Sequence, residues 1–186
     1  MALTKLNARS ASALDATILT GNLPAINGSA LTNLVAGKIG QVIQVIFETD
    51  TDFAASSFQD ITGGGNTLAA SITPTATNSK VLVTYITQAQ HGNNKGYKTQ
   101  LERAISGGAT TNVLTIPNQK DTYGDGDTNA GRSSVQYLDS PSTTSATTYT
   151  VMIGTDGAGT VTIANGGSQC MITLMEVLAW VIQNQQ

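Results

Sequence analysis

Short runs of alternating apolar and polar residues, separated by clusters of turn-forming residues, limit this fold more than any other feature of the sequence. Lys80–Gln90 and Thr147–Gly154 both follow this period of two. Such runs, repeated at intervals of about 8–12 residues, predict a β-sandwich or jelly roll of about eight to ten antiparallel strands. The sequence does not alternate strand and helix signals as a parallel α/β sheet would. We therefore expect an all-β fold, a jelly-roll sandwich head.

Other strands are expected at the segments 58–61, 67–73, 97–105, 135–138 and 160–164. The polar stretch Pro117–Ser134 contains three glycines and is expected to be a surface loop. Asp156–Gly159 is expected to be the turn of a hairpin that joins the strands on either side of it.

Two predicted strands, at 40–48 and from Cys170 to about Ile182, are apolar on both faces. A strand of this kind is buried on both sides, which a monomeric sandwich rarely requires. We therefore expect the first and last strands to lie together, with one face in the core and the other against neighbouring subunits. The predicted trimer interface is Val42, Ile43, Val45, Ile46, Met171, Met175, Val177 and Val181.

The N-terminal segment 1–38 differs from the rest of the chain. It has no charged residue between Ala16 and Gly37, and Gly21, Pro24 and Gly28 rule out a continuous helix. We expect an extended arm in residues 1–38 and a trimerisation head in residues 39–186. The large apolar residues of the arm need a partner surface, and the predicted partner-binding set is Leu3, Leu6, Leu14, Ile18, Leu19, Leu23, Ile26, Leu31 and Leu34.

Composition argues against several classes of function. Charged residues make up 11% of the chain, the net charge is -3, and no Lys or Arg follows Arg132, so a nucleic-acid surface is not expected. The single Cys170 excludes an intrachain disulfide. No run approaches the roughly 18 apolar residues of a membrane span, and the first residues lack the apolar core of a signal peptide.

Candidate catalytic and metal-binding residues are few. His91 is the single histidine, and no Gly-x-Ser-x-Gly motif accompanies it, so we expect a plain loop histidine and no enzyme. One Cys and one His are too few for a usual zinc site, and no cofactor is expected. Asp125, Asp127 and Asn129 have calcium-loop spacing, but Gln136 stands where a bidentate Glu is needed. A solvated turn is the favoured interpretation of this loop, and calcium binding stays open.

Gly21–Leu34 reads GNLPAINGSALTNL and closely resembles a phrase found in the stalks of tailed-bacteriophage fibres. The segments Leu68–Val83, Val135–Val151 and Thr173–Val177 are similar to a recurrent domain of phage virions. The resemblance implies a homotrimer of tumour-necrosis-factor-like jelly-roll heads packed around a threefold axis. Only about 38 residues precede the head, which is too short for a long fibre shaft.

We therefore expect a capsid decoration, or cement, protein on the virion surface, made in the host cytoplasm without a signal peptide. Its partners would be itself and the major capsid protein. The alternative is a short tail fibre or receptor-binding tip that contacts host glycans through Gly92–Gly96 and Pro117–Ser134. The sequence leaves open the host, the location on capsid or tail, and the face of the end strands that forms the trimer contact.

Overall fold

A computed structural model of the chain describes residues 39–92, 96–119, 128–156 and 159–178. The chain divides into two units, Met1–Ala36 and Gly37–Gln186, and all described residues belong to the second. The predicted partner-binding leucines and isoleucines of the arm, together with Val181, lie outside the described residues. The account below concerns the second unit alone.

The described part of this unit is built almost entirely from β-strands. In chain order its elements are β1 (Ile39–Phe47), β2 (Thr51–Phe53), β3 (Gln59–Asp60), β4 (Thr62–Gly63), β5 (Asn66–Thr67), β6 (Ala69–Ile72), β7 (Lys80–Gly92), β8 (Tyr97–Ile105), β9 (Thr110–Gln119), β10 (Thr128–Asp139), β11 (Thr147–Thr155), β12 (Val161–Ile163), the 3-10 turn η3 (Asn165–Gly167) and β13 (Cys170–Val177).

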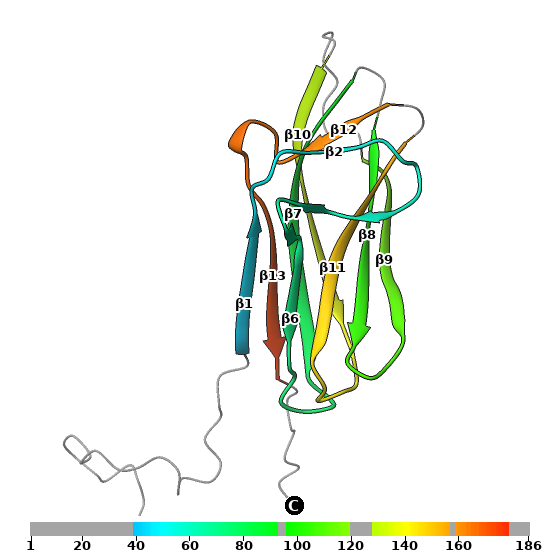
Figure 1. The fold of residues 1–186 in the computed structure, drawn as a ribbon. Helices are drawn as coiled ribbons and strands as arrows, with labels where there is room; N and C mark the ends of the chain where they lie inside the picture. Colours follow the sequence, from blue (N-terminus) through cyan, green and yellow to red (C-terminus); the bar gives the residue numbers. More distant parts are fainter. Residues whose placement is uncertain (1–38, 93–95, 120–127, 157–158, 179–186) are drawn as a thin grey trace, which may run out of the picture. The chain divides into compact units, whose positions relative to one another are not determined.

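Two antiparallel sheets form the sandwich (Figure 1). In sheet A the long strands follow the order β1-β13-β7-β10, and β12 and β2 continue the sheet beside the end of β7. In sheet B the order is β9-β8-β11, with β6 and β3 both paired to the far side of β11. Numbered along the chain, the eight longest strands have the order 1-8-3-6 in one sheet and 2-7-4-5 in the other. This is the strand order of a jelly roll, so the predicted fold class is confirmed.

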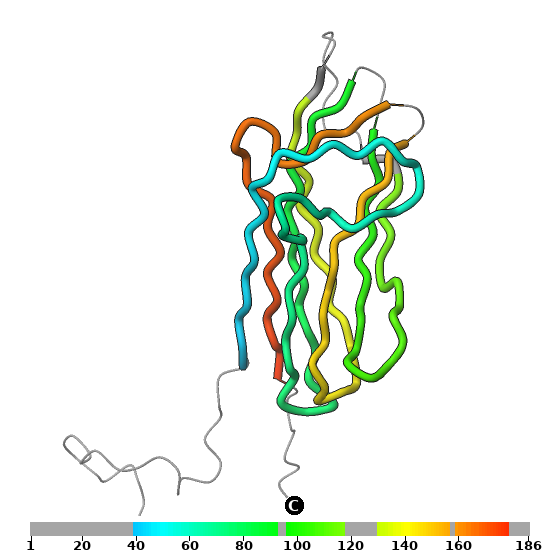
Figure 2. Tube along the Cα trace, viewed as in Figure 1, coloured from blue at the N-terminus to red at the C-terminus, as the bar shows by residue number. Residues whose placement is uncertain are grey.

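The first and last described long strands lie side by side, as predicted from their apolar character (Figure 2). β1 and β13 pair antiparallel over almost their full lengths, from Ile39 opposite Val177 to Phe47 opposite Cys170. β13 in turn pairs with β7, so it lies inside the sheet, whereas β1 is an edge strand.

The core lies between the sheets and is formed by the inward-facing residues of both. Alternate residues of β7, β11 and β13 are fully buried, as the strand period of two requires. The largest fully buried apolar and aromatic side chains of the core, from these and other segments, are Phe47, Ile61, Leu68, Tyr85, Tyr97, Leu101, Tyr149, Ile153, Ile163, Ile172 and Leu174. Tyr85 Oη lies 2.9 Å from Thr99 Oγ1, so a core phenol keeps a hydrogen-bond partner.

One predicted connection is wrong. β12 does not form a hairpin with β11, because β12 pairs with β2 and β7 in sheet A whereas β11 belongs to sheet B. The chain after β11 therefore changes sheets. The physical reason is burial: Val161 and Ile163 face the core from sheet A and cover the end of the sandwich beside β2.

The predicted loop Pro117–Ser134 is shorter than expected. β9 continues to Gln119, and β10 begins at Thr128 and pairs with β7 along its whole length. The first half of β10, residues 128–134, contains no large apolar residue, and it can still be a strand because backbone pairing does not need apolar side chains. The residue pattern predicted no strand at β9. A bulge in β9 opposite Leu101 and Glu102 interrupts the alternation of side chains on which such a prediction depends.

An ion pair between the buried Asp139 and the half-buried Arg103 joins the two sheets near the end of β10. Arg103 Nη1 on β8 lies 2.9 and 2.8 Å from the two carboxylate oxygens of Asp139, and Tyr149 Oη on β11 donates a hydrogen bond of 2.6 Å to Asp139 Oδ2. Burial and the hydrogen bond to Asp139 both raise the pKa of Tyr149, so the phenol remains a donor. Asp139 therefore holds one strand of sheet A to two strands of sheet B.

We predict that Asp139→Ala lowers the free energy of unfolding by about 3 kcal/mol, because it leaves Arg103 without its buried partner and Tyr149 without its acceptor. Urea unfolding at one fixed protein concentration measures the change. Asp50→Ala removes an exposed carboxylate and is the control, with an expected loss below about 0.5 kcal/mol. Equal losses in the two variants would contradict the bridging role.

Candidate functional site

The outer face of sheet A carries three parallel rows of side chains that cross β1, β13, β7 and β10. Successive side chains on each strand alternate between core and solvent, and the pairing registers place the outward residues of the four strands opposite one another. In strand order, the first row is Val42, Met175, Leu82 and Leu138; the second is Gln44, Thr173, Thr84 and Gln136; the third is Ile46, Met171, Ile86 and Ser134.

None of these twelve side chains is charged, and seven are large and apolar. Val42 is 58% exposed, Leu138 48% and Ile46 45%, and the central residues of the rows are half-buried by their neighbours. Monomeric proteins rarely expose this much apolar surface in one region, so the surface is a candidate contact with another molecule. We name these three rows the ladder face.

The outer face of sheet B has the opposite character. Its equivalent rows are polar and carry two carboxylates: Ser71, Thr148, Ala104 and Thr110; Ala69, Thr150, Glu102 and Asn112; Asp60, Met152, Gln100 and Thr115. Met152 is the single large apolar residue of these rows. The outer face of sheet B is therefore mostly polar, whereas the ladder face is mostly apolar.

The structure divides the predicted trimer-interface residues between the two sides of the sheet. Five of them project outward, namely Val42, Ile46, Met171, Met175 and Val177. Ile43 and Val45 pack against the core of the sandwich, so they do not belong to the ladder face. Val181 lies outside the described residues.

Sequence reasoning missed the contribution of β7 and β10 to this face. Leu82 and Ile86 project outward from β7 between the buried Val81, Val83 and Tyr85. Since apolar residues occupy both alternating positions of Lys80–Ile86, the signal used for the two end strands could also have identified β7. Leu138 gave no comparable signal, because the residues next to it in the sequence include both polar and apolar side chains.

The polar row lies between the two apolar rows, and some of its hydrogen-bonding groups are paired within the chain. Gln44 Nε2 donates a hydrogen bond of 3.0 Å to Thr173 Oγ1 on the neighbouring strand and lies 4.0 Å from Met171 Sδ. The row therefore presents amide and hydroxyl groups to any molecule that covers the ladder face.

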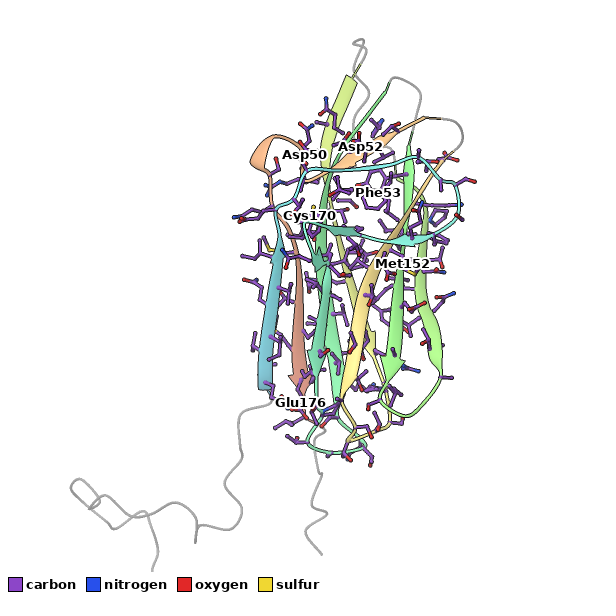
Figure 3. The ribbon with its side chains drawn as sticks, in the orientation of Figure 1. Asp50, Asp52, Phe53, Met152, Cys170 and Glu176 are labelled. Atoms are coloured by element: carbon purple, nitrogen blue, oxygen red, sulfur yellow. The ribbon has the colours of Figure 1, made fainter. Side chains whose placement is uncertain are left out.

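A buried carboxylate fixes the edge of this face where β1 begins. Figure 3 shows Glu176 at the end of β13, opposite the end that holds Cys170. Its Oε1 accepts hydrogen bonds from Thr75 N at 2.6 Å and Thr75 Oγ1 at 2.7 Å, and its Oε2 accepts one from Gln41 Nε2 at 2.9 Å. A Cβ at Gly40 would lie 2.7 Å from Oε2, so the backbone of β1 passes close to the carboxylate.

Two opposing effects set the pKa of Glu176. Burial raises the pKa, but the hydrogen bonds from Thr75 and Gln41 favour the carboxylate more strongly, and the pKa is lowered from its ordinary value. The ionised form therefore holds the start of β1 to β13 and to the turn before β7.

The other residues considered in the sequence do not gather into a reactive site in the described structure. His91 is buried, its Nδ1 lies 3.1 Å from Gly92 O, and its Nε2 has no hydrogen-bond partner. Asp125, Asp127 and the side chain of Asn129 lie outside the described residues. Within the described ranges, no three His, Cys, Asp or Glu side chains are grouped so that they could hold a metal ion. No helix in those ranges has the length and apolarity to cross a membrane.

Comparisons with protein-family models and with curated proteins gave no match. Among solved structures, Eiger TNF from S. frugiperda is similar with a TM-score of 0.42 and 10% identity, covering 78% of this chain and 98% of that one. The VP2 subviral particle of infectious bursal disease virus is similar with a TM-score of 0.41 and 12% identity, covering 84% of this chain and 42% of that one. Likeness at this level identifies no family, and the fold assignment rests on the strand order.

We predict that Glu176 contributes to stability above a pH of about 4.5 and that this contribution is lost as the pH falls. The direction of this change follows from the lowered pKa. Below the ordinary glutamate pKa the unfolded chain binds a proton at this carboxylate more readily than the folded chain does, so acid favours unfolding. Melting temperatures between pH 3 and 7 provide the measurement. Glu176→Gln should lower the melting temperature at pH 7 and flatten its decline at acid pH.

Glu48→Gln removes an exposed carboxylate just after β1 and is the matched control for Glu176→Gln. Its melting profile should run parallel to that of the unmodified protein. If Glu176→Gln also gave a parallel profile, the carboxylate would not have the proposed stabilising role.

Proposed function

We propose that this chain is a structural protein of a tailed-bacteriophage virion that assembles as a homotrimer through the ladder face. The observation that carries the proposal is the contrast between the two outer faces, with seven large apolar residues and no charge in the rows of one and a polar surface on the other. Burial of about 500 Å² of apolar area per copy would contribute on the order of 12 kcal/mol before the costs of association. The resemblance of Gly21–Leu34 to fibre-stalk sequences supports the assignment to a virion and the proposed number of three subunits.

The more specific proposal is that the trimer is a capsid decoration protein. Residues 1–38 would bind the major capsid protein with their large apolar side chains, and the head would face outward. Three arms on one trimer raise the effective affinity, because the first arm to bind holds the others near their sites. The work of such a protein is mechanical, and no catalytic group or cofactor is needed for it.

We predict that the purified full-length protein is a trimer and that Val42→Lys dissociates it, because three ammonium groups would have to be buried in an apolar contact. Light scattering over a range of concentrations measures the mass. The concentration at which half of the trimer dissociates should rise at least about tenfold. Because the dissociation constant of a trimer scales with the square of that concentration, this rise corresponds to about 2.8 kcal/mol per trimer. Circular dichroism should show that the variant keeps its β-structure.

Thr115→Lys is the matched control, because it changes an exposed β-branched residue on an edge strand of sheet B. This variant should remain trimeric. Dissociation by both variants would contradict the assignment of the contact to the ladder face, and a monomeric unmodified protein would overturn the homotrimer itself.

We predict that deletion of residues 1–38 leaves a folded trimer that no longer binds expanded capsids, because the head has its own core and its own contact face. Co-sedimentation with capsids that lack this protein measures binding. A full-length variant with Leu23→Ser, Leu31→Ser and Leu34→Ser should also lose binding.

Thr20→Ser, Asn27→Ser and Thr32→Ser form the matched control for the arm, since they change the same number of residues without removing a large apolar side chain. This variant should bind as the unmodified protein does. Retained binding after the deletion would overturn the arm hypothesis. If a label on this protein were found at the tail, in a few copies per virion, the short-fibre alternative would be favoured.

A further inference from the structure

The polar row of the ladder face has a glutamine at each end. Gln44 lies on β1 and Gln136 on β10, the two outer strands of the four that cross the face. Gln44 uses its amide nitrogen to reach Thr173 inside the subunit, while its carbonyl oxygen has no partner among the described residues. Gln136 is exposed, and the described structure gives its side chain no hydrogen bond. Both row ends therefore retain hydrogen-bonding capacity directed away from their own subunit.

A closed ring of identical subunits brings different edges together. In a cyclic trimer the contact is heterologous, so one side of the contact face meets the other side of the same face on the next copy. If the strands of sheet A run along the symmetry axis, each row lies at the same height in all three copies. The β1 end of a row then meets the β10 end of the same row on its neighbour.

We propose, building on the homotrimer proposed above, that the Gln136 side chain of each copy hydrogen-bonds with Gln44 of the next copy and so closes the polar row around the ring. A primary amide both donates and accepts, so the two ends are complementary without any charge. Apolar rows on either side of this contact exclude water from it, which strengthens the amide pairs.

This pairing would set the height at which the three copies assemble. A slip by one row moves two residues, or about 6.6 Å, along each strand and places the amides against the row of Val42 and Leu138 or that of Ile46. Buried amides would then lack partners, whereas the apolar rows by themselves would tolerate the slip. A polar layer within an apolar contact fixes register in the same way in coiled coils.

The experiment is a disulfide cross-link in the full-length protein that carries Gln44→Cys and Gln136→Cys. The two positions are three strands apart in one subunit, about 14 Å, which is too far for an intrachain disulfide. Cys170 is buried, and burial raises the pKa of its thiol, so it should not compete. Oxidation should give covalent dimers and trimers on a non-reducing gel, in a yield at least about tenfold above that of each single variant.

Two further pairs test the register and the face. Gln44→Cys with Leu138→Cys joins neighbouring rows and should cross-link at least about tenfold less. Ser71→Cys with Thr110→Cys occupies two row ends on the outer face of sheet B and should not cross-link. Melting curves of the reduced variants verify that each one is folded.

The outcomes separate this inference from the proposed function. Light scattering that gives a monomer for the unmodified protein overturns the homotrimer, and the inference with it. A trimer whose Gln44→Cys/Gln136→Cys variant does not cross-link, or whose Gln44→Cys variant cross-links alone, overturns only the ring contact. A mismatched pair that links as well as the matched pair overturns the proposed register.

Discussion

The antiparallel pairing of β1 with β13 is the constraint on which the rest of the structure depends. It joins the first described strand to the last, so both belong to one sheet, with β13 inside it and β1 at its edge. Because each strand is apolar on both faces, this pairing sends Ile43, Val45 and Ile172 inward and leaves Val42 and Met175 outside. Opposite faces of the same pair of strands therefore contribute to the core and to the ladder face.

The rows of the ladder face keep their alignment only if the outer strands of the face stay in place. At one end Glu176 ties Gln41 on β1 to Thr75 before β7, through hydrogen bonds that favour the ionised carboxylate. At the end of β10, Asp139 connects sheet A to Arg103 and Tyr149 of sheet B. A contact surface whose edges are fixed before association loses less conformational entropy when it binds, and this favours a specific assembly.

Much of the fold followed from local pattern. The all-β class, most strands and the neighbouring positions of the first and last strands were predictable, because alternation reports which residues of a strand are buried. β12 was placed in the wrong hairpin, since proximity in sequence favours pairing and the change of sheet at Val161 depends on contacts with β2 and β7. The early start of β10 was not predicted because residues 128–134 lack the alternating apolar side chains that indicate a buried strand.

The sequence by itself determined that the chain forms short antiparallel strands and that its end strands need cover on both faces, because these properties depend on the order of side chains along one strand. Tertiary structure decided which residues share a surface. Register alone brings Val42, Met175, Leu82 and Leu138 into one row although they are distant in sequence, and it places a polar row beside them. Strand pairing is a long-range interaction, and so the ladder face emerged only when the sheet was assembled.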